Sequence, residues 1–338
     1  MMTANVLSWS PVAALMIKAR MAMDVILHIG AHRTASTSFQ IYMRENAHRL
    51  IRDGIGFWGP RRTRNSGVFS GIMPVPSSVP PARQFRLARG RIQTQTSICA
   101  KAGCASLVVS DENILGSPRR NLQKSKLYPD VGDRMARYLE AFGGQVNRIA
   151  LSIRSGDSFW ASQIAFSVER GYDVPDVDAL DRLVTQPRSW RDVITDLRDA
   201  APGVEILVMP YESFGGRPER KLGHMLHHEI TPPLLHSREW VNRRPDLPTL
   251  RAALAERGDD PALLPEGNGR WNPFDANQTA ALRETYADDL YWLRAGADGL
   301  ATLTEETGPD MAGITPPDGL PIRGQTYGIE ERRMAGNR

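Results

Sequence analysis

Short apolar runs alternate along the chain with longer segments in which apolar residues recur every three or four positions. Runs rich in β-branched residues indicate strands, and the three-to-four spacing indicates amphipathic helices. The predicted strands cover residues 25–29, 54–58, 105–109, 146–154 and 204–209. The predicted helices cover residues 37–52, 130–142, 189–200, 217–228 and 275–293. This alternation is typical of an α/β protein, in which helices cover a parallel sheet.

The first strand and the first helix are joined by a short loop, and together they form the strongest local pattern. Gly30 ends the apolar run 25–29, and helical spacing begins at Ser36. Such a loop aims several free backbone N–H groups and the positive end of the helix dipole at one point, which favours phosphate or sulfate. The pattern therefore predicts an anion-binding loop. The alternative is a strand-to-helix turn without a ligand.

Residue spacing distinguishes between kinds of anion-binding loop. A nucleotide-hydrolase P-loop needs a glycine, four further residues, and then Gly-Lys-Ser/Thr. Counted from Gly30, those last positions hold Ala35, Ser36 and Thr37, so the lysine is missing. The basic side chain lies inside the loop instead, as Arg33. This spacing disfavours a kinase or a nucleotide hydrolase.

The order Arg33-Thr34-Ala35-Ser36-Thr37 resembles the 5′-phosphosulfate loop of sulfotransferases that use 3′-phosphoadenosine 5′-phosphosulfate (PAPS), usually Lys-Thr-Gly-Thr-Thr. Arg33 in place of lysine, as in protein-tyrosine sulfotransferases, keeps the positive charge that can hold the leaving phosphate and stabilise the transferring group. Ala35 in place of glycine is costly if that position needs a positive φ. The resemblance implies that contacts to PAPS come from Arg33, Thr34, Ala35, Ser36, Thr37 and Ser38.

A second part of the resemblance follows the fourth predicted strand. In the family, an arginine at the end of a strand and a serine eight residues later, on the next helix, bind the 3′-phosphate. Arg154 and Ser162 have this spacing. The arginine supplies a bidentate and permanently charged grip. The loop 267–273 resembles the family's glycine-rich basic loop that closes over the same phosphate, which implies roles for Gly269 and Arg270.

The third predicted strand is followed by Ser110, Asp111, Glu112 and Asn113. Ligands of open α/β sheets bind beyond the carboxyl ends of the strands, so these side chains should face the same crevice as the anion loop. Glu112 is the candidate general base for the acceptor proton, and His32 is its rival. The alternative is that Ser110 or Asp111 caps a helix and that Glu112 lies in its first turn.

A long basic segment separates the second and third predicted strands. Residues 54–110 contain no Asp or Glu. Their basic residues are Arg61, Arg62, Arg64, Arg83, Arg86, Arg89, Arg91 and Lys101. Several prolines predict that the first half of the segment is irregular. The segment is either a solvated face or a flap that receives an anionic acceptor or covers the cofactor.

The composition is that of an ordinary globular protein, with 41% hydrophobic and 24% charged residues. At 338 residues the chain can form one large α/β domain or two small ones. The net charge of +4 is mild and favours small anionic ligands over nucleic acid.

Cys99 and Cys104 fit neither a zinc knuckle nor a redox pair, so we expect idle thiols in a reducing, cytoplasmic compartment. His224, His227 and His228 lack a convincing carboxylate set, and no metal is expected.

Both ends of the chain are expected to lie outside the folded domain. Residues 1–23 contain an apolar stretch that Pro11 interrupts and that charged residues follow, which matches neither a secretory signal nor a membrane span. We interpret this stretch as a dispensable extension or a misassigned start. Residues 304–338 combine proline, glycine and charged residues without periodicity, which predicts a disordered tail.

The resemblance covers residues 24–303 and implies one three-layer α/β domain with a central parallel sheet, the P-loop-type fold of these enzymes. The implied reaction transfers a sulfuryl group from PAPS to a hydroxyl or amine of a glycan, lipid or small molecule, and an anionic acceptor fits the basic segment. Glu112 or His32 would take the acceptor proton, Arg33 would stabilise charge, and no metal is required. Two alternatives remain: a catalytically inactive relative, which Ala35 favours, and a P-loop kinase.

Overall fold

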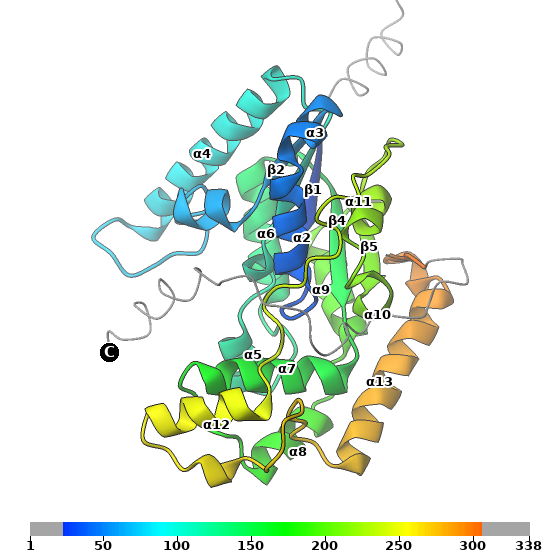
Figure 1. Cartoon of the computed structure of the whole chain (residues 1–338). Helices are drawn as coiled ribbons and strands as arrows, with labels where there is room; N and C mark the ends of the chain where they lie inside the picture. The colour runs from blue at the N-terminus through cyan, green and yellow to red at the C-terminus, as the bar shows by residue number, and fades with distance from the viewer. Residues whose placement is uncertain (1–22, 306–338) are drawn as a thin grey trace, which may run out of the picture.

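Six parallel strands form one sheet in the computed structural model, which describes residues 23–305 (Figure 1). The strands are β1 (Asp24–His28), β2 (Ile55–Trp58), β3 (Ser106–Ser110), β4 (Val146–Ile153), β5 (Glu205–Pro210) and β6 (Thr302–Leu303). Their spatial order is β2-β3-β1-β4-β5-β6, and every neighbouring pair is parallel. The α/β class and the parallel sheet are therefore confirmed. β1 lies between β3 and β4, so the carboxyl ends of these three strands meet at one edge.

Helices connect the strands and cover both faces of the sheet. Between β1 and β4 they are α2 (Ser36–Glu45), α3 (Ala47–Arg52), α4 (Pro81–Lys101), α5 (Pro118–Lys124) and α6 (Val131–Phe142). After β4 they are α7 (Gly156–Glu169), α8 (Val177–Thr185), α9 (Trp190–Ala200), α10 (Tyr211–Phe214), α11 (Pro218–Met225), α12 (Leu247–Glu256) and α13 (Ala276–Arg294). A π-helical turn, Arg61–Asn65, and a 3₁₀ turn, Glu112–Ile114, follow β2 and β3.

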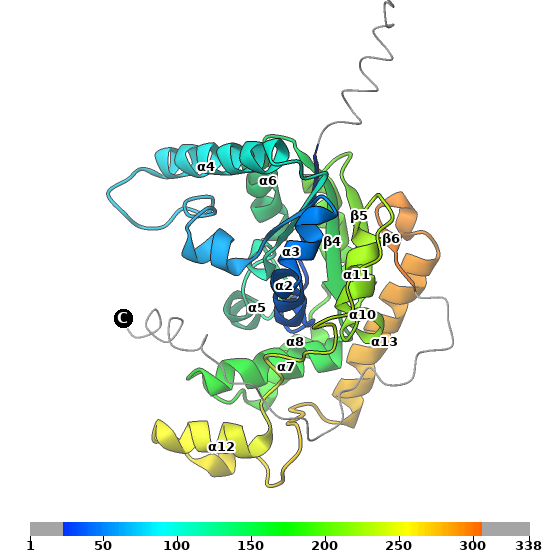
Figure 2. The same ribbon diagram turned by 45° about the horizontal axis from the view of Figure 1, so that its top comes forward.

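The side chains of the central strand alternate between two hydrophobic cores. Val25 and Leu27 of β1 belong to the core that includes residues of α4, α6 and α9, whereas Ile26 belongs to the core that includes residues of α2 and α11. This alternation follows from the two-residue period of a strand. Figures 1 and 2 show α2 and α11 on one side of the strands and α6 on the other. The result is three layers, with helices on both faces of the sheet.

The segment predicted as one helix over 37–52 forms two helices instead. α2 ends at Glu45 and α3 begins at Ala47. Asn46 lies between them, and its side-chain amide donates to the carbonyl oxygens of Tyr42 and Leu235, each at 2.9 Å. An asparagine that bonds to nearby backbone carbonyls competes with the helical pattern, which explains the break.

The elements beyond the carboxyl edge of the sheet shape the candidate site. α7 packs against both α12 and α13, and Figure 1 shows α5, α7, α8 and α12 grouped below the strands. Across residues 23–305, no helix combines the length and the apolar character needed to cross a membrane. The expectations for the two ends of the chain concern residues 1–23 and 304–338, of which 1–22 and 306–338 lie outside the described residues. The expected tail begins too early, because the N–H of Thr304 donates to the carbonyl of Val208 at 2.8 Å and Glu305 pairs with Arg294 at 2.7 Å.

Candidate anion-binding site

The loop between β1 and α2 adopts two left-handed backbone conformations at residues that are not glycine. Arg33 has φ 68°, and Ala35, which precedes the first residue of α2, has φ 61° and ψ 26°. Residues other than glycine rarely adopt this backbone conformation, which costs roughly 1–2 kcal/mol per residue. The position at which the sulfotransferase motif has glycine therefore does take a positive φ here, and Ala35 carries the strain.

The loop is fixed to the sheet and leaves the start of α2 open. The backbone N–H of Ala31 donates to the carbonyl of Ser152 at 2.9 Å, and the hydroxyl of Thr34 donates to the carbonyl of Ala31 at 2.6 Å. A larger residue at Gly30 would require the Ser36 side chain to move, because a Cβ atom there would lie 2.6 Å from Ser36 Oγ. No side chain in the described part of the chain caps α2. The backbone N–H groups of its first turn are thus left for another acceptor, which suits an anion.

The hydroxyl groups of Thr37 and Ser38 contact a long segment that we call the strap, residues 226–246, between α11 and α12. Ser38 Oγ accepts from the backbone N–H of Val241 at 3.1 Å, and Thr37 Oγ1 accepts from the Asn242 amide at 3.2 Å. Both hydroxyls act as acceptors toward the strap. Their own protons therefore stay available for donation to a ligand.

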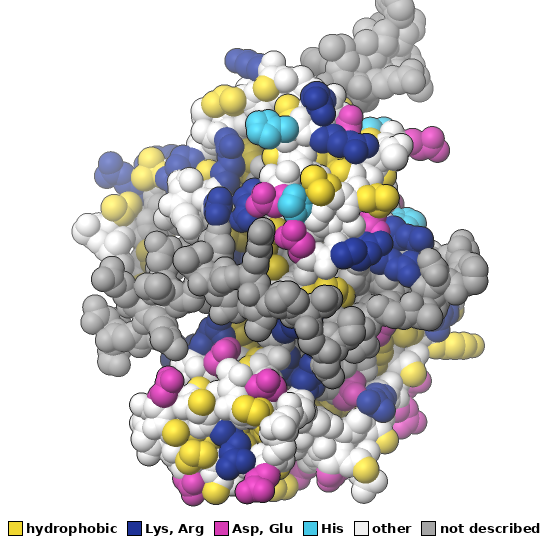
Figure 3. All heavy atoms as spheres, viewed as in Figure 1, with side chains coloured by type: hydrophobic (Ala, Val, Ile, Leu, Met, Phe, Trp, Pro, Cys, Tyr) yellow, Lys and Arg dark blue, Asp and Glu magenta, His cyan; other side chains and the backbone are white. Residues whose placement is uncertain are grey.

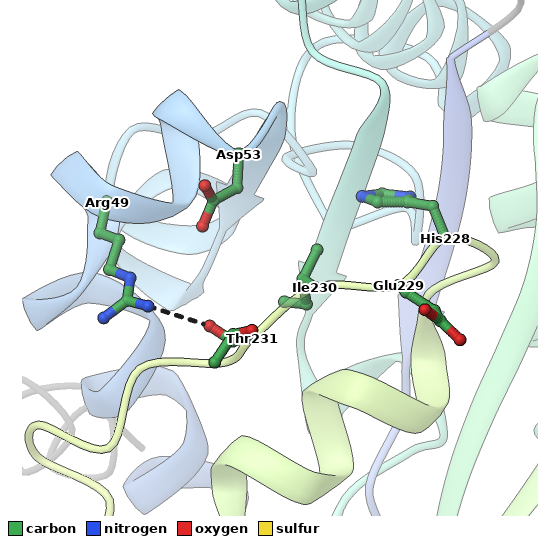
Figure 4. A pocket seen from close by; sticks show the side chains of 6 residues that line it. All are labelled: Arg49, Asp53, His228, Glu229, Ile230 and Thr231. Atoms are coloured by element: carbon green, nitrogen blue, oxygen red, sulfur yellow. Dashed lines mark hydrogen bonds between the residues drawn. The ribbon is translucent and has the colours of Figure 1, made fainter.

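Further bonds hold the strap along α2 and α3. The Tyr42 hydroxyl donates to the carbonyl of Pro233 at 2.9 Å, and the Arg49 guanidinium donates to the carbonyl of Thr231 at 3.1 Å (Figure 4). Arg49 and Thr231 also line a cavity of about 330 Å³ at the end of α3, far along the helices from the anion loop. The strap therefore runs along α3 and α2, and Val241 and Asn242 near its end lie against the start of α2.

Three residues singled out by the sulfotransferase motifs come together at the carboxyl edge. The Nε of Arg33 donates to Ser162 Oγ at 3.0 Å, and the guanidinium of Arg154 donates to the carbonyl of Arg33 at 2.7 Å. Arg154 also lies over the ring of Tyr211, 4.3 Å from its centroid, and Arg33 lies 5.1 Å from the ring centroid of Phe166. Segments more than a hundred residues apart in sequence therefore meet at one point.

Two further arginines, Arg244 and Arg270, add positive charge close to Arg154. Burial, and then the charges of Arg154 and Arg270, lower the pKa of Arg244 to about 10. Burial, and then Arg154, lower the pKa of Arg33 to about 10 as well. Among the described residues, no hydrogen-bond partner is found for the buried Nε atoms of Arg154 and Arg244. Arg270 lies near enough for its charge to lower the pKa of both Arg154 and Arg244. A backbone bridge between Asp246 and Arg270 joins its loop to the end of the strap, and the adjacent Gly269 accepts from the N–H of Leu247 at 3.0 Å.

The nearest carboxylates are already engaged elsewhere. Asp157 accepts from Arg283 at 2.8 Å, and Glu212 accepts from the hydroxyl of Tyr286 at 2.7 Å and from the backbone of Ser155 at 3.0 Å. A buried charge without a partner is unfavourable, so a group of guanidiniums with unused donors favours an anionic ligand. Arg244 was not identified from the sequence. Its sole signal there was a basic pair in an otherwise featureless loop.

Glu112 and His32 lie together on the other side of the anion loop. Glu112 accepts from the Gln40 amide at 2.9 Å and forms an ion pair with Arg64 at 2.8 Å. Burial raises the pKa of Glu112, but the charge of Arg64 and its hydrogen bond outweigh burial and lower the pKa to about 2. Asp111 caps the 3₁₀ turn by accepting from the backbone of the second residue after it, and Glu112 lies at the first position of the turn. The capping interpretation is thus correct, with Asp111 as the cap and Glu112 in the first turn, where Glu112 also contacts Gln40 and Arg64.

His32 is fully bonded. Its Nδ1 lies 2.9 Å from the hydroxyl of Tyr128, and its Nε2 lies 3.2 Å from Asn113 Oδ1. Burial lowers the pKa of His32, so the ring is neutral at pH 7. Because both ring nitrogens have partners, neither is left as a free proton acceptor. The carboxylate of Glu112 has unused lone pairs and is the better placed of the two candidate bases.

Comparisons with known proteins add no relative: no family model, no curated protein and no solved structure matches the chain.

Proposed function

We propose that the protein binds PAPS and transfers its sulfuryl group to an acceptor. The observation that carries this proposal is the contact of Arg33 with both Arg154 and Ser162. The sequence motifs alone had assigned these residues to the two ends of one nucleotide, the 5′-phosphosulfate and the 3′-phosphate. Their meeting at the carboxyl edge of a parallel sheet is what a P-loop-type sulfotransferase fold requires.

The residues present fit a ligand with two anionic ends. The N–H groups at the start of α2 and the hydroxyls of Thr37 and Ser38 suit the phosphosulfate. The unpaired donors of Arg154 and Arg244 suit a 3′-phosphate, with Arg270 and Ser162 beside them. PAPS, when bound, supplies an activated sulfuryl group. The protein then has to hold both ends and keep the acceptor in line.

Two side chains are assigned chemical roles. Arg33 keeps a positive charge next to the anion loop, where negative charge develops on the leaving phosphate. Glu112 takes the proton of the acceptor hydroxyl or amine. The acceptor belongs to a glycan, a lipid or a small molecule.

One observation favours a second candidate function, a nucleotide-binding relative without turnover. Ala35 places strain in the loop at the position where the active family has glycine. A P-loop kinase is disfavoured, because the loop lacks the lysine that such enzymes need.

A transfer assay separates these functions. The protein is incubated with ³⁵S-labelled PAPS and an extract of the source cell's glycans, lipids and small molecules, and labelled products are separated. Labelled product that depends on the protein supports a sulfotransferase. Binding of 3′-phosphoadenosine 5′-phosphate (PAP) without any labelled product supports the inactive relative. Transfer from ATP with Mg²⁺ instead would mean a kinase.

A further inference from the structure

Arg64 of the basic segment 54–110 forms ion pairs with Asp111 and with the candidate base Glu112. It lies on the π-helical turn Arg61–Asn65 after β2. Its Nε and Nη2 donate to Asp111 Oδ1 at 3.1 and 2.6 Å, and Asp111 is 2% exposed. Thr63 of the same turn donates its hydroxyl to Asp111 Oδ2 at 2.6 Å. The turn is therefore clamped onto the end of β3 by a buried carboxylate.

From this anchor, Arg64 extends a second contact to Glu112. Its Nη2 lies 2.8 Å from Glu112 Oε1, while Gln40 of α2 donates to Glu112 Oε2 at 2.9 Å. Each carboxylate oxygen of Glu112 thus has one donor, from two different elements. This arrangement fixes the orientation of the carboxylate and favours its ionised form.

Other ionisable groups face Glu112 from the neighbouring elements. They are His28 of β1, His32 of the anion loop, Asp111 at the end of β3, Tyr128 before α6, and Arg64 of the π-helical turn. The two histidines have a lowered pKa, chiefly through burial, and are neutral at pH 7. Burial raises the pKa of Tyr128, which keeps its hydroxyl protonated. Arg64 is accordingly the cation that balances Asp111 and Glu112.

We propose that Arg64 is a positioning residue that holds the Glu112 carboxylate ionised and oriented to take the proton of an acceptor hydroxyl. This inference rests on the proposed sulfotransferase function and narrows its acceptor class. In the transfer, the acceptor oxygen forms a bond to sulfur. The bond between sulfur and the bridging phosphate oxygen breaks, with its electron pair left on the phosphate, and the acceptor proton passes to Glu112.

A weakly basic carboxylate suits a hydroxyl acceptor better than an amine. A hydroxyl is neutral before it attacks, and it becomes strongly acidic only as its oxygen bonds to sulfur, so a weak base can accept the proton late. An ordinary alkylamine is protonated at neutral pH, as lysine is with its pKa near 10.4. A carboxylate held by Arg64 and Gln40 is too weak a base to remove that proton first. The pKa of Glu112 near 2 agrees with this.

The test compares Arg64→Gln with Arg62→Gln, a neighbour on the same turn that bonds to Gln95 on α4 instead. The protein is labelled with ¹³C-carboxyl glutamate, the Glu112 resonance is assigned with Glu112→Gln, and spectra are recorded between pH 4 and 8. We expect no titration of Glu112 in the wild type or in Arg62→Gln. In Arg64→Gln we expect a midpoint above the ordinary carboxyl pKa of about 4.3, because burial remains while the cation is gone.

Kinetics provide the second readout. In Arg64→Gln, kcat for a hydroxyl acceptor should fall as the pH drops through the new Glu112 midpoint, by about tenfold one pH unit below it, and recover as pH rises, while the Kd of PAP stays at the wild-type value. Arg64→Lys should restore part of the activity at low pH, which also guards against a folding defect in the glutamine variant. An unchanged Glu112 resonance in Arg64→Gln would overturn the inference and leave the proposed function intact. Absence of any sulfate transfer by the wild type would overturn the proposed function itself.

Discussion

Arg33 joins the two halves of the candidate site, since its side chain bonds to Ser162 and its carbonyl accepts from Arg154. With a pKa near 10, its guanidinium is charged at neutral pH. We expect Arg33→Ala to lower kcat by about 10² or more and the affinity for PAP by less, because the charge matters most as the leaving phosphate oxygen becomes negative. Steady-state kinetics and PAP titrations measure both quantities.

The matched control for that variant is Arg33→Lys. It loses the bond from Nε to Ser162 but keeps a positive charge, so substantial turnover should remain. If Arg33→Ala raised only KM and left kcat unchanged, Arg33 would be a binding residue and not a stabiliser of the transition state.

Lys221 is a buried cation behind the anion loop, 1% exposed, and it donates to Ser152 Oγ at 3.1 Å. Burial lowers its pKa to about 7. In the unfolded chain a lysine holds its proton up to about pH 10.4. Between about pH 7 and pH 10 the unfolded state therefore binds more protons than the folded state, and the free energy of unfolding rises with pH across that window. Below pH 7 the folded state carries the full penalty.

We expect Lys221→Met to be more stable than the wild type at pH 7 and to show a smaller rise in stability between pH 7 and 9. Urea unfolding at several pH values measures the difference. Lys101→Met, at an exposed position of α4, serves as the control and should keep the wild-type pH dependence. Parallel stability curves for Lys221→Met and the wild type would contradict the lowered pKa of Lys221.

At the scale of elements, the strap connects α2 to the arginine group. Its bonds to Thr37 and Ser38 fix the segment just before Arg244. We expect Arg244→Ala to weaken PAP binding about tenfold, because a charge-assisted bond to a phosphate is lost. The neighbouring Arg243→Ala is the matched control and should bind PAP as the wild type does. Equal losses in the two variants would show that the strap supplies only general positive charge.

Sequence patterns predicted strands β1 to β5 and several helices well, but the 21-residue helix α4 was not among the predicted helices. The ends of β4, α6 and α9 lie within one or two residues of the predicted ends, because their periodicity is strong and their neighbours are clear stops. The break at Asn46 was missed, since it depends on Leu235, 189 residues away. Contacts between residues distant in sequence also explain which residues of the candidate site were missed. Arg33 and Arg154 were found through motif spacing, whereas Arg64 and Arg244 are brought in by tertiary contacts of irregular segments.

At the scale of the whole molecule, the basic segment 54–110 divides into two parts. Arg64 is tied to carboxylates at the end of β3. Arg83, Arg86 and Arg89 are instead exposed on α4, and Figure 3 shows basic side chains gathered over this helix in the upper left of the view. The expectation of one flap over the acceptor therefore remains a hypothesis for α4. The structure connects only Arg64 of these four to the candidate site.

The central claim is that the site holds a nucleotide with phosphate groups at both its 5′ and 3′ ends. Calorimetry with PAP and with adenosine 5′-phosphate tests it directly, on the wild type, on Arg154→Ala, and on Arg120→Ala, which removes a surface ion pair with Asp130. We expect PAP to bind the wild type and Arg120→Ala alike, and Arg154→Ala to lose about 2 kcal/mol toward PAP and little toward adenosine 5′-phosphate. Equal affinity of the wild type for the two nucleotides would contradict the claim.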